Sequence, residues 1–444
     1  MVILLLLLLM TLIASVCFNS VSIFNIILLS IGIICASIYI KRRSIYKNYA
    51  SYILLSLMWF STTFMPACHL VYSNENYVTI TPQINNHILG FGIPVFSLTS
   101  IALLLSTYFK AGFVISKTNA FKPYIIPTYI AKFVMIASIL LSVFCYLTGL
   151  GRMGADAVVL PYHLGGVINL FRSLMLPSLF VVLIEGFIIR KQRVPKTIWI
   201  LYIIWCIFEI IAWLSKGVLL KNLAPAMFLL YIYFRPSAGK VLKIVSPLLF
   251  IFLFIYPIVE IMRYGEGGSL KDNIIEAQAE AYQDNDYSIL KPLNRIFMYG
   301  TKFAQDERYI NTDDLFDFSR FPSLIAVGGA ARYQTFVIDG YPPGVNHSSG
   351  TCGVIDPLLH GGKGLVYLVA LLLVLLALFI DKLIKKGYVS IAVILLQLLV
   401  FYIINENVTS FYDESGLQMY LVYAVTIYIA YQLNYKRKII RSSP

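Results

Sequence analysis

Arg263 lies at the end of a long apolar stretch, between two acidic residues that could take part in chemistry with it. The spacing of Glu260, Arg263 and Glu266 places the three side chains near one face of a continuing helix. A guanidinium fixed at the level of lipid headgroups is suited to a diphosphate. A neighbouring carboxylate could accept a proton from a sugar hydroxyl. The alternative is an interfacial salt bridge that ends the helix.

Arg172 lies inside an apolar stretch, toward one of its ends. An arginine at the centre of a membrane span costs roughly 2.5–3.5 kcal/mol on insertion scales, so it normally faces a cavity or a partner. We therefore expect Arg172 to bind an anionic group or a buried counter-ion. The alternative is a side chain that extends to the lipid headgroups.

Residues 263–363 form a long polar segment that contains four more arginines. Several arginines in one domain above a membrane could bind lipid diphosphates, although the acidic residues among them also fit a solvated surface. Two of the four lie beside apolar or glycine-rich sequence and are the better candidates. The four are Arg295, Arg308 and the two better candidates, Arg320 and Arg332.

His347 lies on a loop rich in glycine and proline, where an imidazole could act as a base or orient a hydroxyl. A surface histidine without a function is the alternative. Asp339, Asp356 and His360 lie nearby in the sequence, but their spacing matches no known metal site. We therefore predict no metal.

Three further charged residues lie within apolar stretches. Glu185 lies close to Arg190 and is expected to pair with it. Lys132 and Glu209 lie deeper, and they could pair with each other or line a pathway.

The composition indicates which environment positions these residues. Hydrophobic residues make up 59% of the 444 residues and charged residues only 13%. A soluble protein has about a quarter charged residues, so the deficit indicates a membrane protein. The net charge of +13 does not indicate nucleic-acid binding, because the basic residues lie in short runs between apolar stretches.

The apolar stretches predict an all-α polytopic membrane protein of about twelve transmembrane helices. The predicted spans are residues 2–17, 21–40, 50–72, 88–109, 124–148, 165–189, 197–213, 222–234, 241–262, 364–380, 387–404 and 417–433. The span 222–234 is short and could be tilted, kinked at Pro225 or re-entrant. The chain thus divides into nine spans in 1–262, a large loop at 263–363, and three spans with a basic tail in 364–444.

Basic residues concentrate in alternate connections between these spans, which makes those connections and both termini cytoplasmic. The loop 263–363 then lies on the extracytoplasmic side. No phosphate-binding loop, dinucleotide fingerprint, nucleophile elbow or HExxH motif occurs. Since no cytoplasmic connection is long enough for a nucleotide-binding domain, any substrate should be lipid-borne, external or transported.

Three segments carry a resemblance to a known family. The segments CGVIDPLLHGGKGLVYLVALLLVLLAL, IVEIMRYGEGG and ARYQTFVIDG, together with the topology, resemble Wzy-type O-antigen polymerases, the oligosaccharide repeat unit polymerases. The resemblance implies a fold similar to the lipid-dependent (GT-C-like) glycosyltransferases. It implies polymerisation of undecaprenyl-diphosphate-linked repeat units at the outer face of a bacterial inner membrane, in lipopolysaccharide or other surface polysaccharide biosynthesis.

The same resemblance implies roles for the residues described above. Arg172, Arg263, Arg320 and Arg332 would bind the diphosphate, and Glu266 or His347 would act as the catalytic base. The expected partners are the lipid-linked oligosaccharide, membrane lipid and a chain-length regulator protein, with no cofactor and no nucleic acid.

Three other functions remain open. An O-antigen ligase has the same topology and donor but a different acceptor. A flippase or another transporter would move a substrate without transforming it, although it would often show internal repeats, which this chain lacks. A structural scaffold would not need a buried arginine.

Overall fold

The computed structural model describes residues 22–64, 82–109, 127–151, 160–161, 164–189, 194–213, 217–235, 239, 315–319, 322–323, 326, 356–405 and 414–435. These residues are largely helical. The α-helices are α2 (Ile23–Arg42), α3 (Tyr49–Trp59), α5 (Pro82–Leu105), α6 (Thr128–Thr148), α7 (Leu164–Leu170), α8 (Leu176–Ile189), α9 (Lys196–Trp213), α10 (Gly217–Phe234), α17 (Asp356–Lys386), α18 (Val389–Asn405) and α19 (Glu414–Ala430). Short helical turns are η1 (Ile45–Lys47), η2 (Phe60–Phe64), η4 (Phe171–Met175) and η7 (Tyr431–Tyr435).

The helices fall where the apolar stretches predict them. The predicted spans 2–17 and 241–262 lie outside the described residues, and each of the other predicted spans overlaps described helical residues. The total of twelve spans therefore stays a prediction, as does the large loop. The all-helical character is confirmed for the described residues.

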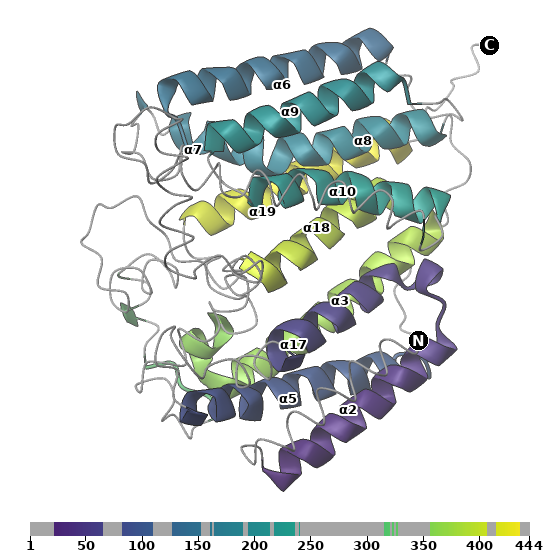
Figure 1. The fold of residues 1–444 in the computed structure, drawn as a ribbon, viewed down its shortest axis with the longest axis vertical. Coiled ribbons are helices and arrows are strands. Elements are labelled where there is room, and N and C mark those ends of the chain that lie inside the picture. The colour runs from purple at the N-terminus through teal and green to yellow at the C-terminus, as the bar shows by residue number, and fades with distance from the viewer. Residues whose placement is uncertain are drawn as a thin grey trace, which may run out of the picture.

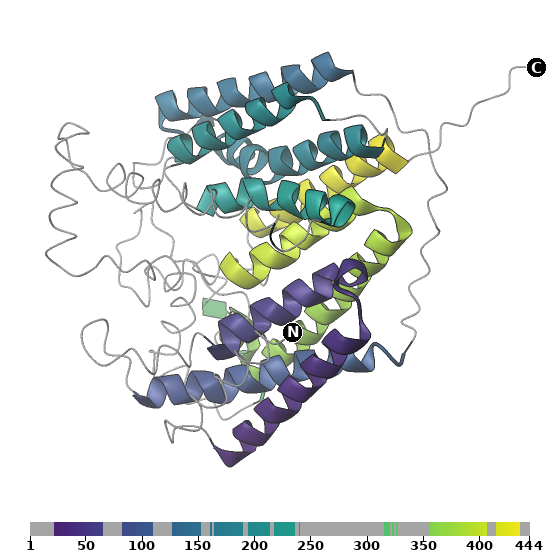
Figure 2. The ribbon, with the colours of Figure 1, turned by 45° about the vertical axis from the view of Figure 1, so that its right-hand side comes forward.

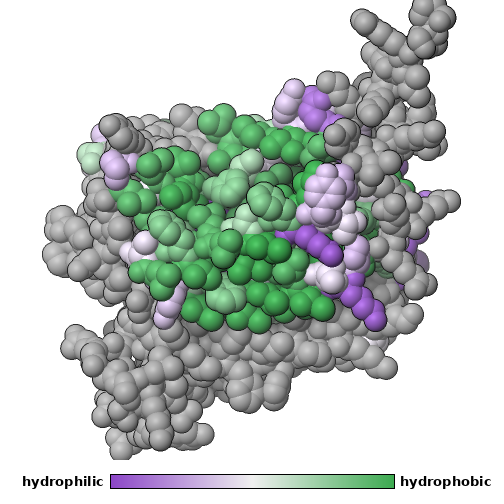
Figure 3. Space-filling view, turned by 90° about the horizontal axis from the view of Figure 1, so that it is seen from above, coloured by the Kyte–Doolittle hydropathy of each residue, from purple (hydrophilic) through white to green (hydrophobic). Residues whose placement is uncertain are grey.

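Five described helices are long and apolar enough to cross a membrane. They are Ile23–Arg42, Thr128–Thr148, Leu164–Ile189, Lys196–Trp213 and Gly361–Lys386. Figure 3 shows the face on the α6 side, where a broad hydrophobic area is bordered by hydrophilic residues toward one end. These features are those of a helical membrane protein.

The helices form a bundle in which segments distant in sequence lie side by side. Figures 1 and 2 show α2, α3, α5 and α17 in one part of the bundle and α6, α8, α9 and α10 in another. Helices α18 and α19 lie between these parts. Helix α17 therefore packs against helices from the beginning of the chain, although more than two hundred residues separate them.

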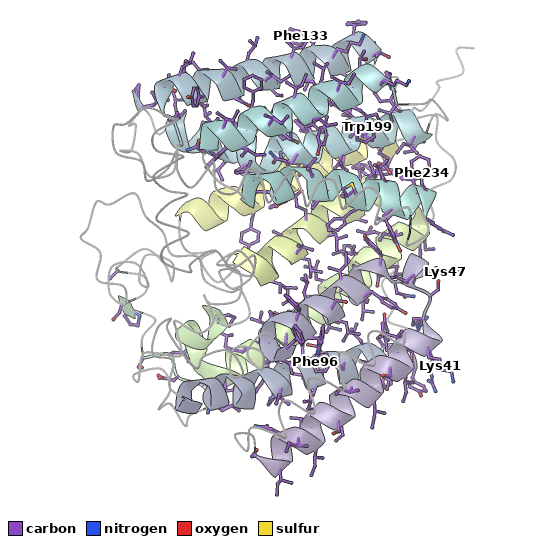
Figure 4. The ribbon with its side chains drawn as sticks, viewed as in Figure 1. Lys41, Lys47, Phe96, Phe133, Trp199 and Phe234 are labelled. Atoms are coloured by element: carbon purple, nitrogen blue, oxygen red, sulfur yellow. The ribbon has the colours of Figure 1, made fainter. Side chains whose placement is uncertain are left out.

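The helix ends with basic residues gather at one end of the bundle. Figure 4 shows Lys41 and Lys47 at the same end as Trp199, near the start of α9, and Phe234, the last residue of α10. We call this the basic end. Helix α7 and the start of α17 lie at the opposite end in Figure 1. The described basic residues at these helix ends thus share one end of the bundle, and the assignment of that end to the cytoplasm stays a prediction.

Small and hydroxyl-bearing residues bring α2 and α5 close together. A Cβ on Gly32 would lie 2.7 Å from Ser97 Oγ, and this hydroxyl donates to the Leu28 carbonyl at 2.8 Å. Helix association within lipid depends on close packing and hydrogen bonds, because lipid chains are as apolar as the side chains. Gly32 and Ser97 therefore account for this contact.

Helix α10 is longer than its sequence predicts. It begins at Gly217 and contains Pro225, whereas the predicted span covers only 222–234. Proline lacks an N–H and disturbs the hydrogen bonds of the preceding turn. In that turn the Tyr202 hydroxyl of α9 donates to the Asn222 carbonyl. A neighbouring helix thus supplies a donor where the proline disturbs the backbone.

Asp381 joins α17 to the start of α3 near the basic end. The Asp381 carboxylate accepts from the Ala50 N–H at 2.8 Å, the Ser51 N–H at 3.2 Å and the Ser51 hydroxyl at 2.5 Å. It therefore caps a helix N-terminus, where a negative charge is stabilised. The predicted span 364–380 ended too early, since α17 continues to Lys386 and buries Asp381.

We expect Asp381→Ala to lower the free energy of unfolding by about 1–3 kcal/mol, because buried N–H groups lose their acceptor. Asp381→Asn keeps one oxygen acceptor and should cost less. Heating each variant in detergent and measuring the remaining monodisperse protein gives the comparison. Equal midpoint temperatures for wild type and Asp381→Ala would contradict the capping role.

Candidate functional site

Arg172 lies on a π-helical turn that interrupts a longer helix. Helix α7 ends at Leu170, the π turn η4 covers Phe171–Met175, and α8 begins at Leu176. Such turns insert an extra residue, and they are frequent at functional sites. The Arg172 side chain is fully buried. The side chain therefore does not extend out of the bundle, and its predicted role in diphosphate binding stays a prediction.

The partner of Arg172 is Glu209 of α9. Arg172 Nε donates to Glu209 Oε1 at 3.1 Å, and Arg172 Nη2 donates to Glu209 Oε2 at 3.3 Å. The two parallel contacts form a bidentate pair, the strongest geometry for a guanidinium and a carboxylate. Both side chains are almost completely buried. The pair brings opposite charges together inside an apolar bundle and makes the local net charge zero.

Neighbouring groups complete the surroundings of this ion pair. Glu209 also accepts from the Ser142 hydroxyl of α6 at 2.5 Å and from Trp213 Nε1 at 2.8 Å. Arg172 Nη1 donates to the Leu150 carbonyl at 3.4 Å, and its Cζ lies 5.1 Å from the centre of the Trp213 ring. Glu209 thus receives donors from three helices, α6, α9 and the helix of Arg172.

Leu150 and Trp213 also locate the pair within the bundle. Leu150 follows the left-handed Gly149 that ends α6, and Trp213 is the last residue of α9. The pair therefore lies close to the end of the bundle opposite the basic end, where α7 is drawn in Figure 1. Its position agrees with the outer half of the membrane in the predicted topology.

Lys132 and Glu209, which the sequence allows either to pair or to line a pathway, do not pair with each other. Ser142, which contacts Glu209, lies ten residues after Lys132 on the same helix. This separation corresponds to about 15 Å along the helix axis. Lys132 therefore lies too far along α6 to be the partner, and Arg172 takes that place.

Glu185 forms a second buried polar cluster, nearer the basic end of the bundle. It accepts from the Tyr233 hydroxyl at 2.6 Å, from Asn434 Nδ2 at 2.8 Å and from the Tyr435 hydroxyl at 2.8 Å. These donors come from α10 and η7. Arg190, the partner expected from the sequence, lies outside the described residues. The cluster connects α8 to η7, the last helical turn among the described residues.

A short described segment of the predicted large loop, residues 315–319, contacts the start of α17. The Gly364 N–H donates to the Leu315 carbonyl at 2.6 Å, and the Asp317 N–H donates to the Gly361 carbonyl at 3.3 Å. A Cβ on Gly364 would lie 2.5 Å from the Phe316 ring. Glycine is therefore needed here for the close approach of residues 315–319.

The start of α17 is also broken at two glycines. Gly362 has a φ of 77°, a left-handed conformation that glycine adopts without a steric penalty, and Gly361 is likewise non-helical. A Cβ on Gly361 would lie 2.6 Å from the Phe318 ring. The glycine-rich segment identified in the sequence thus forms a kink, on which part of the large loop rests.

Five of the six predicted site residues lie outside the described part of the chain. They are Glu266, His347, Arg263, Arg320 and Arg332. Arg320 directly follows the described segment 315–319 in the sequence. The roles of these five residues stay predictions.

Sequence reasoning missed several residues of the buried clusters, among them Ser142, Trp213 and Asp381. Ser142 and Trp213 gave no signal, since a serine and a tryptophan at helix positions are common in membrane proteins. Asp381 did give a signal in the sequence, because it is the single acidic residue among the lysines that follow an apolar stretch. An acidic residue in such a basic connection is a candidate cap for a neighbouring helix.

The described site is thus a neutral, buried ion pair near one end of a membrane bundle, with a loop contact at the same end. The pair holds the Arg172 guanidinium inside the bundle without exposing it to lipid. No protein-family model matches this chain, and comparisons with curated proteins and with solved structures also found no match.

Proposed function

We propose that this chain polymerises lipid-linked oligosaccharide repeat units at the end of the bundle opposite the basic end. The observation that carries the proposal is the contact of Leu315–Ser319 with Gly361 and Gly364. It joins the large loop to the segment with the family resemblance. A loop fixed on a bundle end could cover a lipid headgroup there.

The proposed reaction needs neither a nucleotide nor a metal. A hydroxyl of the incoming repeat unit attacks the anomeric carbon of the growing chain, and the bond from that carbon to the diphosphate oxygen breaks. The diphosphate leaves on its lipid with the bonding electrons, and a base takes the hydroxyl proton. Positive groups near the leaving oxygens stabilise the charge that develops on them.

The proposal assigns these tasks to the predicted residues. Glu266 or His347 would take the proton, and Arg263, Arg320 and Arg332 would bind the diphosphate. Arg172 is a special case, because Glu209 already neutralises it. A guanidinium has five N–H groups. The N–H groups of Arg172 that do not contact Glu209 or Leu150 have no acceptor among the described residues. These remaining groups could contact a phosphate oxygen.

The buried carboxylates favour an enzyme over a proton-coupled transporter. Transporters place ionisable residues along a pathway, where they change partners. In the described part of the bundle, Glu209, Glu185 and Asp381 each accept several hydrogen bonds from neighbouring helices. Their contacts hold helices together, which fits a fixed scaffold beneath an external site.

Deletion of the gene in its host, followed by gel analysis of the surface glycolipid, tests this proposal. The expected result is a ladder that collapses to the core with a single repeat unit, restored by the gene on a plasmid. Accumulation of long lipid-linked polymer would instead indicate a ligase. Single lipid-linked units trapped on the cytoplasmic side would indicate a flippase, and either of these results would refute the polymerase.

A further inference from the structure

Basic residues from segments far apart in the sequence meet at the basic end. They lie at the end of α2, in η1 and in the last turns of α17. Lys385 Nζ donates to Asn48 Oδ1 at 2.8 Å, which joins α17 to the residue before α3. Lys385 also lies within Coulombic range of Arg43, Lys47 and Lys382. We call Arg42, Arg43, Lys47, Lys382 and Lys385 the cationic cluster.

The acidic residue in this cluster does not neutralise it. Asp381 also lies within Coulombic range of Lys385, but its two oxygens are occupied by Ala50 and Ser51. The Asp381 carboxylate thus caps the N-terminus of α3. Even without Lys382, one negative charge against Arg42, Arg43, Lys47 and Lys385 leaves an excess of positive charge among the described residues. Like charges held this close favour an anionic ligand between them.

The end of α5 holds two of the arginines in place. Arg43 Nη2 donates to the Thr107 carbonyl at 3.4 Å, at the end of α5. The guanidinium of Arg42 lies 4.6 Å from the centre of the Tyr108 ring. A cation over an aromatic ring is a stabilising contact that restricts the side chain. Arg42 and Arg43 are therefore positioned side chains, whereas an unrestrained charge would sample many conformations.

An apolar stripe leads along α2 directly to this cluster. The residues of the stripe recur at intervals of three or four and so lie on one face of the helix. They are Ile23, Ile27, Ile31, Ile34 and Ile38, with exposed fractions of 77%, 54%, 41%, 57% and 37%. The opposite face of α2 is buried through Leu29, Gly32, Ala36 and Tyr39. The stripe thus forms an exposed apolar face of α2 and ends one turn before Lys41 and Arg42.

We infer that the cationic cluster and the stripe of α2 bind one anionic phospholipid. The acyl chains would lie along the isoleucines, and the phosphate would lie between the arginines and lysines. Basic pockets between transmembrane helices on one side of a membrane bind such headgroups. The binding site is independent of the proposed polymerase activity, which lies at the other end of the bundle. The proposed ligand class is a phospholipid with a net negative headgroup, such as phosphatidylglycerol or cardiolipin.

Native mass spectrometry of the full chain tests this inference with matched variants. The purified protein is titrated with phosphatidylglycerol and separately with phosphatidylcholine. The site variant Lys47→Gln/Lys385→Gln removes two charges from the cluster, and glutamine can still donate to Asn48. The control variant Lys132→Gln/Lys196→Gln removes two charges from α6 and the start of α9, so both variants have the same net charge.

We expect wild type to retain one phosphatidylglycerol in a saturable manner. The site variant should bind it about tenfold or more weakly, because each basic residue near a headgroup contributes about 1 kcal/mol. The control variant should bind like wild type. Arg42→Gln, a change at an exposed residue, should weaken binding in the same direction if the double variant does not fold.

Three outcomes would overturn the inference. Equal weakening in the site and control variants would mean diffuse attraction by net charge. Equal retention of phosphatidylcholine would mean an ordinary lipid contact along α2. Displacement of phosphatidylglycerol by inorganic pyrophosphate at low concentration would mean that the cluster binds a soluble diphosphate.

Discussion

Replacing Glu209 by alanine should lower the free energy of unfolding by about 3–5 kcal/mol, because Arg172 is left buried without a counter-ion. The loss should be larger than for Asp381→Ala, in which no buried cation is left unpaired. Ser142 and Trp213 would also lose their acceptor. The midpoint of thermal aggregation in detergent measures the effect.

A double variant separates the stability of the ion pair from its function. Arg172→Met/Glu209→Leu replaces both charges with apolar side chains of similar volume, a change that is often neutral or stabilising. We expect its midpoint temperature to return close to that of wild type. If Arg172 contacts the diphosphate, the double variant should still fail to make long polymer.

Two results would refute this account of the pair. A single Glu209→Ala variant as stable as wild type would mean that the pair does not hold α8 and α9 together. A double variant that is stable and makes normal polymer would remove Arg172 from the site. The midpoint temperature and the polymer length of each variant are therefore measured separately.

Replacing Gly364 by alanine should abolish or strongly shorten the polymer while the bundle remains folded. The added Cβ would lie 2.5 Å from the Phe316 ring and 2.8 Å from the Leu315 carbonyl. Overpacking of this kind costs about 1–3 kcal/mol, and the exposed loop segment can move more easily than α17. The loop should therefore leave the helix, and with it the proposed cover of the active site.

Gly166→Ala is the matched control for this substitution. Gly166 lies in α7 at the same end of the bundle, and a Cβ there has no heavy atom within 4 Å. Alanine in a helix is more stable than glycine by about 0.5–1 kcal/mol, so the control should fold at least as well as wild type. Gel analysis of polymer length at equal protein level gives the comparison. Normal polymer from Gly364→Ala would mean that the contact of the loop with α17 is not needed.

The positions of the helices could be predicted because lipid imposes a length and a composition on each span. The span at residues 165–189 coincides with Leu164–Ile189, which contains α7, η4 and α8. Two details could not be predicted. The π turn at Arg172 depends on tertiary packing, and the continuation of α17 past residue 380 depends on the contact of Asp381 with the N-terminus of α3, which Asp381 caps. The apolar content of a sequence segment indicates neither the π turn nor the point at which α17 ends.

The sequence predicted a site residue only where a single charged residue lies within an apolar stretch. Arg172 stands out in an apolar stretch, and its burial with a partner followed from the cost of charge in lipid. The identity of the partner did not follow, because Lys132 and Arg172 are both cations that could reach Glu209 in some arrangement of the helices. Only the packing of α6, α8 and α9 distinguishes them. A contact between distant segments cannot be read from periodicity.

Reconstitution of the purified chain with a lipid-linked repeat unit tests the central claim most directly. The protein is placed in proteoliposomes with undecaprenyl-diphosphate-linked oligosaccharide and no other protein, nucleotide or added metal. We expect a ladder of lipid-linked oligomers and release of undecaprenyl diphosphate, one molecule for each bond formed. Repeat units that remain single, whether or not they cross the bilayer, would contradict it.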